Sequence, residues 1–231
     1  VLGHPFIAVM SEGNSPERVR MMAALGAEVV LVPQVSGGVA GQVSGADLAR
    51  VEDEARRITA LRGAFRADQF NHPGNPAAHV DGTAAEIWAQ SAGALTAFCD
   101  FAGSGGTLAG VSEALGPKGV RCYGVEPVGA EVLAGKQVVR ADHPIQGGGY
   151  AMPELAHLQG VPLAGFLAVR GDEARDRARL LARTEGIFAG YSAGANLAAA
   201  LHLLAGPERG GTVAMIACDS GLKYLSTDLW G

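Results

Sequence analysis

The sequence predicts an α/β protein in three layers, αβα, with mostly parallel sheets covered by helices on both faces. Two observations predict this class. Along all 231 residues, short runs rich in branched and aromatic apolar side chains alternate with amphipathic or alanine-rich segments of helical length, which is typical of parallel sheets covered on both sides. The chain also opens with a strand, a helix and a second strand, and such a βαβ unit implies parallel pairing.

The first seventy residues carry two expected strands and two expected helices. In order, these are a strand at 6–10, a helix beginning at Ser15 and ending at Gly26, a strand at 27–32, a glycine- and serine-rich loop at 36–45 and a helix at 47–61. Ser15 has the residue type of a helix N-cap, and Pro16 suits the first helical position. Apolar residues recur on one face of the second helix, which is therefore expected to be amphipathic.

The alternation continues after a turn-rich stretch at 68–76, where the composition changes. The expected elements are then a helix at 77–92, a strand at 95–101, a helix to Leu115, a strand at 121–125, a helix and loop at 129–141, a glycine cluster at 145–150, a strand at 165–169, a helix capped by Asp172 and running to Thr184, a helix at 195–204 and a strand at 212–217. The break predicts two subdomains, a smaller one over residues 1–70 and a larger one over 71–231.

Composition argues against several classes of function. The net charge is −5 and the chain has no run of Lys or Arg, so neither nucleic acid nor an acidic membrane surface is an expected partner. No apolar run is long enough to span a membrane and no signal peptide is found, which favours a cytoplasmic protein. Cys99, Cys122 and Cys218 lie in apolar runs and are expected to be buried thiols. The six histidines show no metal-ligand spacing, so no metal is expected.

A glycine-rich turn gives the first indication of a ligand. Residues 95–101 have the character of a buried strand, and an alanine-rich helix begins soon after them. The residues between strand and helix are Gly103, Ser104, Gly105, Gly106 and Thr107. Backbone N–H groups converge at such a helix N-terminus, and the missing side chains let an anion approach. The turn is therefore a candidate phosphate site, although a tight turn without a ligand would have the same composition.

A dinucleotide site is one alternative for this turn. The glycines follow a strand, and Glu126 ends the next strand at a suitable distance for a contact with a ribose. However, Leu108 occupies the position where the dinucleotide fingerprint needs a third glycine. An oxidoreductase that binds NAD therefore stays a remote alternative.

A serine hydrolase is a second alternative, because residues 190–194 satisfy the nucleophile-elbow pattern around Ser192. The pattern requires an acid and then a histidine further along the chain. Only His202 follows, and it lies ten residues along the same expected helix, while Asp219 comes after it. The elbow thus has no triad, and the hydrolase interpretation fails.

A third interpretation uses both glycine motifs. One end of a ligand would place a phosphate at Gly103–Thr107, and the other would place a polar ring atom at Ser192. Pyridoxal phosphate has this shape, with a phosphate on one side and a ring nitrogen on the other.

A set of short motifs running the length of the chain supports this interpretation. They are Ser15-Pro-Glu-Arg, Leu25-Gly-Ala-Glu-Val, Gln69-Phe, Asn75-Pro, Gly82-Thr, Glu86-Ile-Trp88, Gly103-Ser-Gly-Gly-Thr107, Val125-Glu-Pro127, Ile145-Gln-Gly147, Glu185-Gly-Ile187, Ser192-Ala-Gly194, Asp219-Ser-Gly221 and Tyr224-Leu-Ser-Thr227. With these motifs in this order, the chain resembles the cysteine synthase (O-acetylserine sulfhydrylase) and cystathionine β-synthase family of fold-type II pyridoxal-phosphate enzymes. The resemblance implies a fold like that of the tryptophan synthase β-subunit, a homodimer and an amino-acid substrate.

The resemblance also implies roles for individual residues. Gly103–Thr107 match the loop that binds the cofactor phosphate, and Ser192 matches the serine that hydrogen-bonds the pyridine nitrogen. Gln69 matches a position that helps to bind the substrate carboxylate. Gly147 and Gly148 lie where the family's backbone lines the substrate pocket.

The chain departs from the family in its lysines. Family members carry the Schiff-base lysine and a substrate loop before the point that corresponds to Val1, so the chain is expected to be N-terminally incomplete. Lys118, Lys136 and Lys223 do not follow the family's lysine pattern and are expected to be solvated, so no catalytic residue is identified. The expected activity is β-replacement, forming cysteine from O-acetylserine and sulfide, with this chain alone inactive. A cystathionine β-synthase-like enzyme and a lysine-less binding or regulatory protein are the alternatives.

Overall fold

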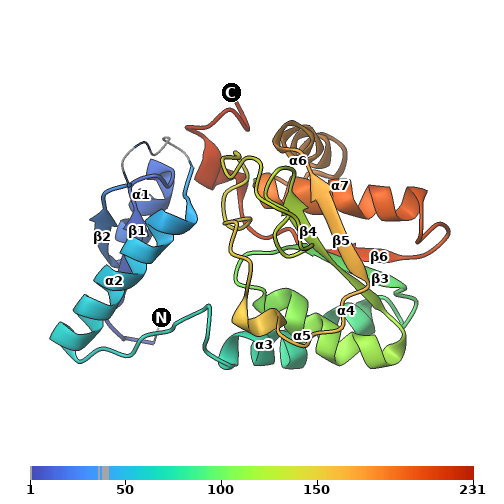
Figure 1. Ribbon diagram of the computed structural model, residues 1–231, viewed down its shortest axis with the longest axis horizontal. Helices are drawn as coiled ribbons and strands as arrows, with labels where there is room; N and C mark the ends of the chain where they lie inside the picture. Colours follow the sequence, from blue (N-terminus) through green and yellow to red (C-terminus); the bar gives the residue numbers. More distant parts are fainter. Residues whose placement is uncertain (1, 36, 38–41) are drawn as a thin grey trace.

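The computed structural model describes residues 2–35, 37 and 42–231, which form two parallel sheets (Figure 1). The N-terminal unit contains β1 (Ile7–Ser11), α1 (Pro16–Ala24), β2 (Glu28–Val32) and α2 (Gly45–Arg62). β1 and β2 pair in parallel, with Ile7 opposite Glu28. This arrangement is the βαβ unit expected at the start of the chain.

The second sheet has four strands in the order β5 (Gly165–Val169), β4 (Arg121–Pro127), β3 (Ala97–Phe101) and β6 (Val213–Met215). Every pairing in it is parallel. All five residues of β3 are buried, because this strand has a neighbour on both edges and helices over both faces. The strand whose residues are all buried is therefore central in the sheet.

Helices cover both faces of the four-stranded sheet (Figure 1). One face carries α3 (Gly74–Ala78), the π-helical turn η1 (His79–Ala84), α4 (Ala85–Gln90) and α5 (Gly106–Leu115), and the other carries α6 (Gly171–Glu185) and α7 (Tyr191–Ala205). Each face has its own apolar core: Phe98 packs with Leu108 below the sheet, and Cys99 packs with Ala195 above it. The three-layer αβα class with parallel sheets is confirmed.

Two expected helices differ from the structure. Residues 77–92 are divided among α3, η1 and α4, and the π turn begins where α5 packs closely, since a Cβ on Gly110 would lie 2.8 Å from Cβ of His79. The helix expected within 129–141 is absent. Turns occupy this stretch, where Gly129 has a positive φ of 97°, and the Glu126 carboxylate accepts from the N–H groups of Leu133 and Ala134 instead.

Smaller corrections concern caps and ends. Ser15 stands at the N-cap position of α1, but its hydroxyl donates to the Lys223 carbonyl instead of capping the helix. Asp172 lies inside the first turn of α6, whose N-cap position is Arg170. α7 begins at Tyr191 rather than 195, which places Ser192 in its first turn, and β6 is shorter than the expected strand at 212–217. Cys99 and Cys122 are buried as expected, but Cys218 is an exposed residue.

Candidate functional site: a cleft at the carboxyl ends of the strands

The loop between β3 and α5 is shaped by close approach of its neighbours. A Cβ on Gly103 would lie 2.7 Å from the Gly147 carbonyl oxygen, and one on Gly106 would lie 2.1 Å from Oδ1 of Asn75. Gly105 has a φ of +83° at the N-cap of α5, a conformation that glycine adopts without strain. A side chain at Gly103 would collide with backbone and one at Gly106 would displace Asn75, and the loop presents backbone amides at a helix N-terminus, where an anion is favoured.

Polar side chains hold this loop from below. Nδ2 of Asn75 donates to Oγ of Ser104 (3.0 Å) and to the carbonyl oxygen of Gln69 (2.6 Å). Oγ1 of Thr107 pairs with Nε2 of His79 at 3.2 Å. Asn75 therefore joins the backbone of Gln69 to the glycine loop. Sequence reasoning gives the side chains of Asn75 and His79 no role, because their partners in the loop, Ser104 and Thr107, lie 29 and 28 positions away.

The second glycine cluster lies against the first. Gly149 N–H donates to the Ala102 carbonyl (3.0 Å), and a Cβ on Gly148 would lie 2.5 Å from that same oxygen. Gly148 is buried, whereas Gly147 is exposed and lines a cavity of about 350 Å³ between this loop and the N-terminal unit. Arg18, Asp47 and His143 also line the cavity, and burial lowers the pKa of His143. Gly147 and Gly148 are thus brought next to the glycine loop.

Ser192 lies on the other face of the sheet, in the first turn of α7. Its side chain is almost buried, with 6% of the residue exposed. The Gly190 N–H donates to the Asp219 carbonyl (3.1 Å), and Ala189 forms an isolated bridge with Ser220, so the segment after β6 fixes the start of the helix. Although the Cys218 residue is exposed as a whole, desolvation of its thiol raises the pKa to about 12, and the nearby Ser192 hydroxyl opposes that shift.

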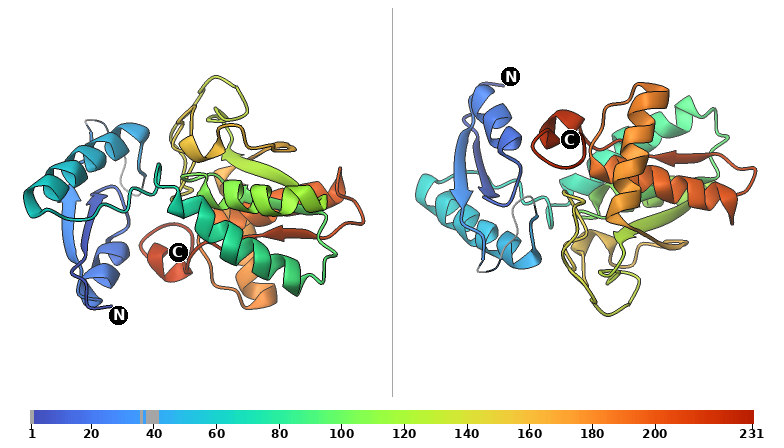
Figure 2. Two further views of the ribbon diagram at one scale, coloured as in Figure 1. Left: turned by 90° about the horizontal axis from the view of Figure 1, so that it is seen from below. Right: turned by 90° about the horizontal axis from the view of Figure 1, so that it is seen from above.

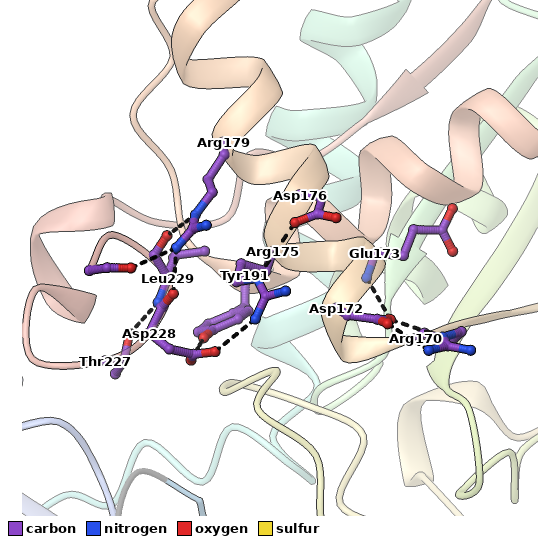
Figure 3. Close-up of polar contacts among 11 residues, drawn as sticks. Arg170, Asp172, Glu173, Arg175, Asp176, Arg179, Tyr191, Thr227, Asp228 and Leu229 are labelled. Atoms are coloured by element: carbon purple, nitrogen blue, oxygen red, sulfur yellow. Dashed lines mark hydrogen bonds and ion pairs between the residues drawn. The ribbon is translucent and has the colours of Figure 1, made fainter.

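The C-terminal residues brace the same helix start (Figure 3). The Tyr191 hydroxyl donates to Oδ1 of Asp228, whose other oxygen accepts from Arg175 at 3.1 Å. Arg179 donates to the carbonyl oxygens of Asp228 (2.8 Å) and Leu229 (2.7 Å). These contacts tie the end of the described chain to α6 and hold Tyr191, the neighbour of Ser192.

None of the three lysines resembles a buried, reactive amine. Lys118 is exposed and lies over the Trp88 ring, 5.1 Å from its centroid. Lys136 is exposed and pairs with Glu131 at 3.6 Å, and Lys223 pairs with Asp219 at 3.4 Å. In the described ranges, no group of three or more His, Cys, Asp or Glu side chains is arranged to hold a metal ion. No described helix has both the length and the apolar character to cross a membrane.

The arrangement fits a ligand with a phosphate and a polar ring atom. Helices α5 and α7 both begin at the carboxyl edge of the parallel sheet, on opposite faces (Figure 1), and this edge is where α/β sheets bind ligands. Side chains at Gly103 and Gly106 would meet the Gly147 carbonyl oxygen and Asn75, so the loop keeps bare backbone amides at the N-terminus of α5, which favour an anion. Ser192 offers a neutral hydroxyl, able to donate to a ring nitrogen.

Comparison with known proteins gives one family. The family described as pyridoxal-phosphate dependent enzyme matches residues 1–219. Cysteine synthase 3 of Caenorhabditis elegans is 34% identical over 235 residues, which cover 100% of this chain and 66% of that protein. O-ureido-L-serine synthase of Streptomyces lavendulae is 36% identical, over 99% of this chain and 67% of that protein. The crystal structure of O-acetyl serine sulfhydrylase isoform 3 from Entamoeba histolytica superposes with a TM-score of 0.82 at 32% identity, covering 99% of this chain and 65% of that one. The chain spans about two thirds of the length of these relatives.

Proposed function

The chain belongs to the family of pyridoxal-phosphate dependent enzymes, and from this premise we propose that its protein forms cysteine from O-acetylserine and sulfide by β-replacement. The similarity to cysteine synthases along the whole chain supports this activity. Pyridoxal phosphate, when bound, supplies the electron sink that lets the substituent on the β-carbon leave. The observation that carries the proposal is that the glycine loop (Gly103–Thr107) and Ser192 both lie at the carboxyl edge of the parallel sheet.

In this proposal the chain's own residues bind and orient. The backbone amides of Gly103–Thr107 hold the cofactor phosphate, with Asn75 fixing the loop through Ser104. The Ser192 hydroxyl hydrogen-bonds the pyridine nitrogen. Because the hydroxyl is neutral, it does not keep the ring protonated as a carboxylate would, which suits elimination and replacement at the β-carbon. Gln69, Gly147 and Gly148 contribute to the amino-acid side of the pocket.

Two other activities of the same class compete. The 36% identity to an O-ureido-L-serine synthase favours β-replacement with a different nucleophile, and similarity to an O-acetylserine dependent cystathionine beta-synthase from Helicobacter pylori, at 30% identity, favours a thiol amino acid as nucleophile. All three activities would use the same glycine loop for the phosphate and the same serine for the ring nitrogen. The substrates must therefore be separated by assay.

The test supplies the complete natural protein with pyridoxal phosphate and O-acetylserine, adding sulfide in one assay and homocysteine in another, with serine replacing O-acetylserine in a third. We expect cysteine from the first pair at the highest kcat/KM. Gly106→Ala is the inactive comparison, and Gly116→Ala, at a position with no atom within 4 Å of a Cβ, is its matched control. Faster formation of cystathionine than of cysteine would replace the substrate assignment.

The 231-residue chain assayed alone is expected to give no turnover. Its three lysines are paired or lie over a ring at the surface, and without a suitable lysine no group can form the covalent link or take the substrate's α-proton. Borohydride reduction followed by mass spectrometry checks this. Turnover together with a reduced adduct on Lys118, Lys136 or Lys223 would contradict it. Turnover by neither protein, with tight pyridoxal phosphate binding, would instead favour the binding or regulatory role.

The resemblance also suggests where and in what state the protein works. We infer a homodimer in the cytoplasm and two subdomains, residues 1–70 and 71–231. Sedimentation velocity of the complete protein tests the dimer, and a single monomeric species at micromolar concentration would contradict it.

A further inference from the structure

A buried carboxyl group lies behind Ser192 and has no part in the proposed chemistry. Asp100 is on β3, with 7% of its surface exposed. Its Oδ1 accepts a hydrogen bond from Nδ2 of Asn196 on α7 (3.0 Å). Asn196 is completely buried. Burying a carboxyl group costs free energy, so Asp100 lowers the stability of the fold unless its hydrogen bond to the helix compensates.

The Asn196 amide joins three segments. Besides Asp100, its Nδ2 donates to the Ile216 carbonyl (3.0 Å) and approaches Sγ of Cys218 (3.7 Å). The Ile216 carbonyl can only accept, so it fixes which end of the amide carries the hydrogens. β3, α7 and the segment after β6 are therefore tied together at one side chain. Oδ1 of Asn196 is buried with no hydrogen-bond partner among the described residues.

This junction leads to the Ser192 hydroxyl. Ser192 and Asn196 are four residues apart on α7 and so share a face of the helix. The Cys218 sulfur accepts from Asn196 (3.7 Å), and the Ser192 hydroxyl is near enough to lower the pKa of the Cys218 thiol. Asn196, held by Asp100 and Ile216, thus fixes the turn of α7 that carries the Ser192 hydroxyl, which has a single proton to donate.

We propose that Asp100 is a positioning residue, which holds Asn196 and through it the first turns of α7, so that the Ser192 hydroxyl is aimed at the ring nitrogen of a phosphorylated pyridine. The inference rests on the proposed function, which places that nitrogen at Ser192. Without the Asp100 carboxylate, one amide hydrogen of Asn196 loses its partner, and α7 loses its side-chain bond to β3. The Ser192 hydroxyl, one turn away on α7, then loses its fixed position. Burial also raises the pKa of Asp100 to about 7, in keeping with a group that is enclosed rather than hydrated.

The test compares two ligands that differ at one atom. Apoprotein made from the complete natural protein is titrated with pyridoxine 5′-phosphate and with its benzene analogue, which has a C–H in place of the ring nitrogen. Neither ligand forms a covalent link with a lysine. The ratio of the two dissociation constants reports the Ser192 contact alone, and a general loss of stability would weaken both ligands together.

We expect wild-type protein to prefer the pyridine by about tenfold, the size of one buried hydrogen bond. Ser192→Ala abolishes this preference, and Asp100→Ala reduces it at least threefold while binding of the benzene analogue changes less than twofold. Asp100→Asn preserves the preference, because its amide oxygen still accepts from Asn196 and its amide nitrogen can donate to Oδ1 of Asn196. Glu208→Gln, a buried carboxylate at the other end of α7 that pairs with Arg121 and Tyr123, is the matched control and keeps the wild-type ratio.

A wild-type ratio in Asp100→Ala, with the preference lost in Ser192→Ala, would overturn the role of Asp100 and leave the proposed function intact. If the wild-type protein itself binds the two ligands equally well, the serine assignment in the proposed function is wrong, and this inference falls with it. If Asp100→Ala does not fold, as judged by circular dichroism, Asp100→Ser takes its place, because the shorter hydroxyl cannot reach Asn196 and the same loss of preference is expected.

Discussion

The side chain of Asn75 is held in place because it packs directly against the backbone of the glycine loop. Asn75 occupies the position that a Cβ on Gly106 would need, and it uses that position to hold Ser104 and the Gln69 carbonyl. The loop was predicted from its composition, because closely spaced glycines between a strand and a helix are typical of a turn that binds an anion. The support from Asn75 could not be predicted, because no local pattern links it to a loop 29 residues away.

Gly106→Ala is expected to lower the affinity for pyridoxine 5′-phosphate at least tenfold. The new methyl group displaces the Asn75 side chain, so that Ser104 and the Gln69 carbonyl lose their donor, and each lost hydrogen bond is worth about 1 kcal/mol. Isothermal titration calorimetry measures the effect, with Gly116→Ala at the other end of α5 as the control. Wild-type affinity in Gly106→Ala would show that the loop tolerates a moved Asn75.

Asp100 makes the stability of the fold depend on pH. Its pKa is about 7 in the folded protein, against a usual value of 3.8. Between these two values the unfolded chain binds fewer protons than the folded one, so stability falls as pH rises from about 4 to about 7 and is constant above that. The neighbouring Cys99 and Cys218 thiols do not contribute, since burial raises both of their pKa values to about 12.

Asp100→Asn is expected to remove this part of the pH dependence. The variant gains stability over wild type at pH 8, by up to about 4 kcal/mol on the linkage relation, and differs little at pH 4. Urea denaturation at both pH values measures the difference, and subtracting wild type from variant cancels the titration of His79 and His143. An equal difference at both pH values would mean that Asp100 is ionised throughout.

At the scale of elements, α1 lies beside the turn η4 (Gly221–Tyr224), and the two segments are close in both views of Figure 2. Nη2 of Arg18 donates to Oδ2 of Asp219 (3.3 Å) and to the Tyr224 hydroxyl (2.6 Å), and its guanidinium lies over the Tyr224 ring. The boundaries of α1 follow from Pro16 and the residues around Gly26. The contact does not, because its partners are about 200 positions apart.

Arg18→Gln is expected to loosen this contact. The variant loses a partly buried ion pair and a stacking interaction, together worth about 1–2 kcal/mol, so amides of α1 and η4 exchange with solvent at least fivefold faster. Hydrogen exchange with mass spectrometry measures this. Arg56→Gln is the control, because Arg56 pairs with Glu52 on the exposed side of α2 and such pairs contribute little. Unchanged exchange in Arg18→Gln would place the stability of the contact in Ser15 and Ser226.

At the scale of the whole molecule, the two sheets are joined by the segment between α2 and α3, residues 63–73 (Figure 1). The alternation of strands and helices predicts both sheets and their parallel pairing, because a helix between two strands forms the crossover connection that parallel strands need. It does not predict the glycine turns at 129–141 or the division of 77–92, where packing against another element overrides local preference.

The joining segment is expected to be the first site of proteolysis. Phe65 is 84% exposed and lies outside any helix or strand, so chymotrypsin reaches its backbone without unfolding. Limited digestion followed by mass spectrometry would give a resistant fragment near 66–231, and Phe65→Ser would slow its appearance. Earlier cleavage beside a buried residue such as Phe98 would contradict the proposed boundary between subdomains.

The position of β6 has a consequence for the order in which the molecule forms during synthesis. β3 takes β6 as its neighbour, and the Thr96 and Thr212 segments that meet at this pairing are 116 residues apart. Contacts of such long separation close slowly, and until they close, β3 lacks one edge partner and Asp100 and Ser192 lack the Cys218 segment. A nascent chain on the ribosome can therefore complete its glycine loop early, whereas the serine half of the cleft waits for the translation of residues 213–219. If the proposed site is right, a cofactor can be held at both ends only after residues 213–219 have been made.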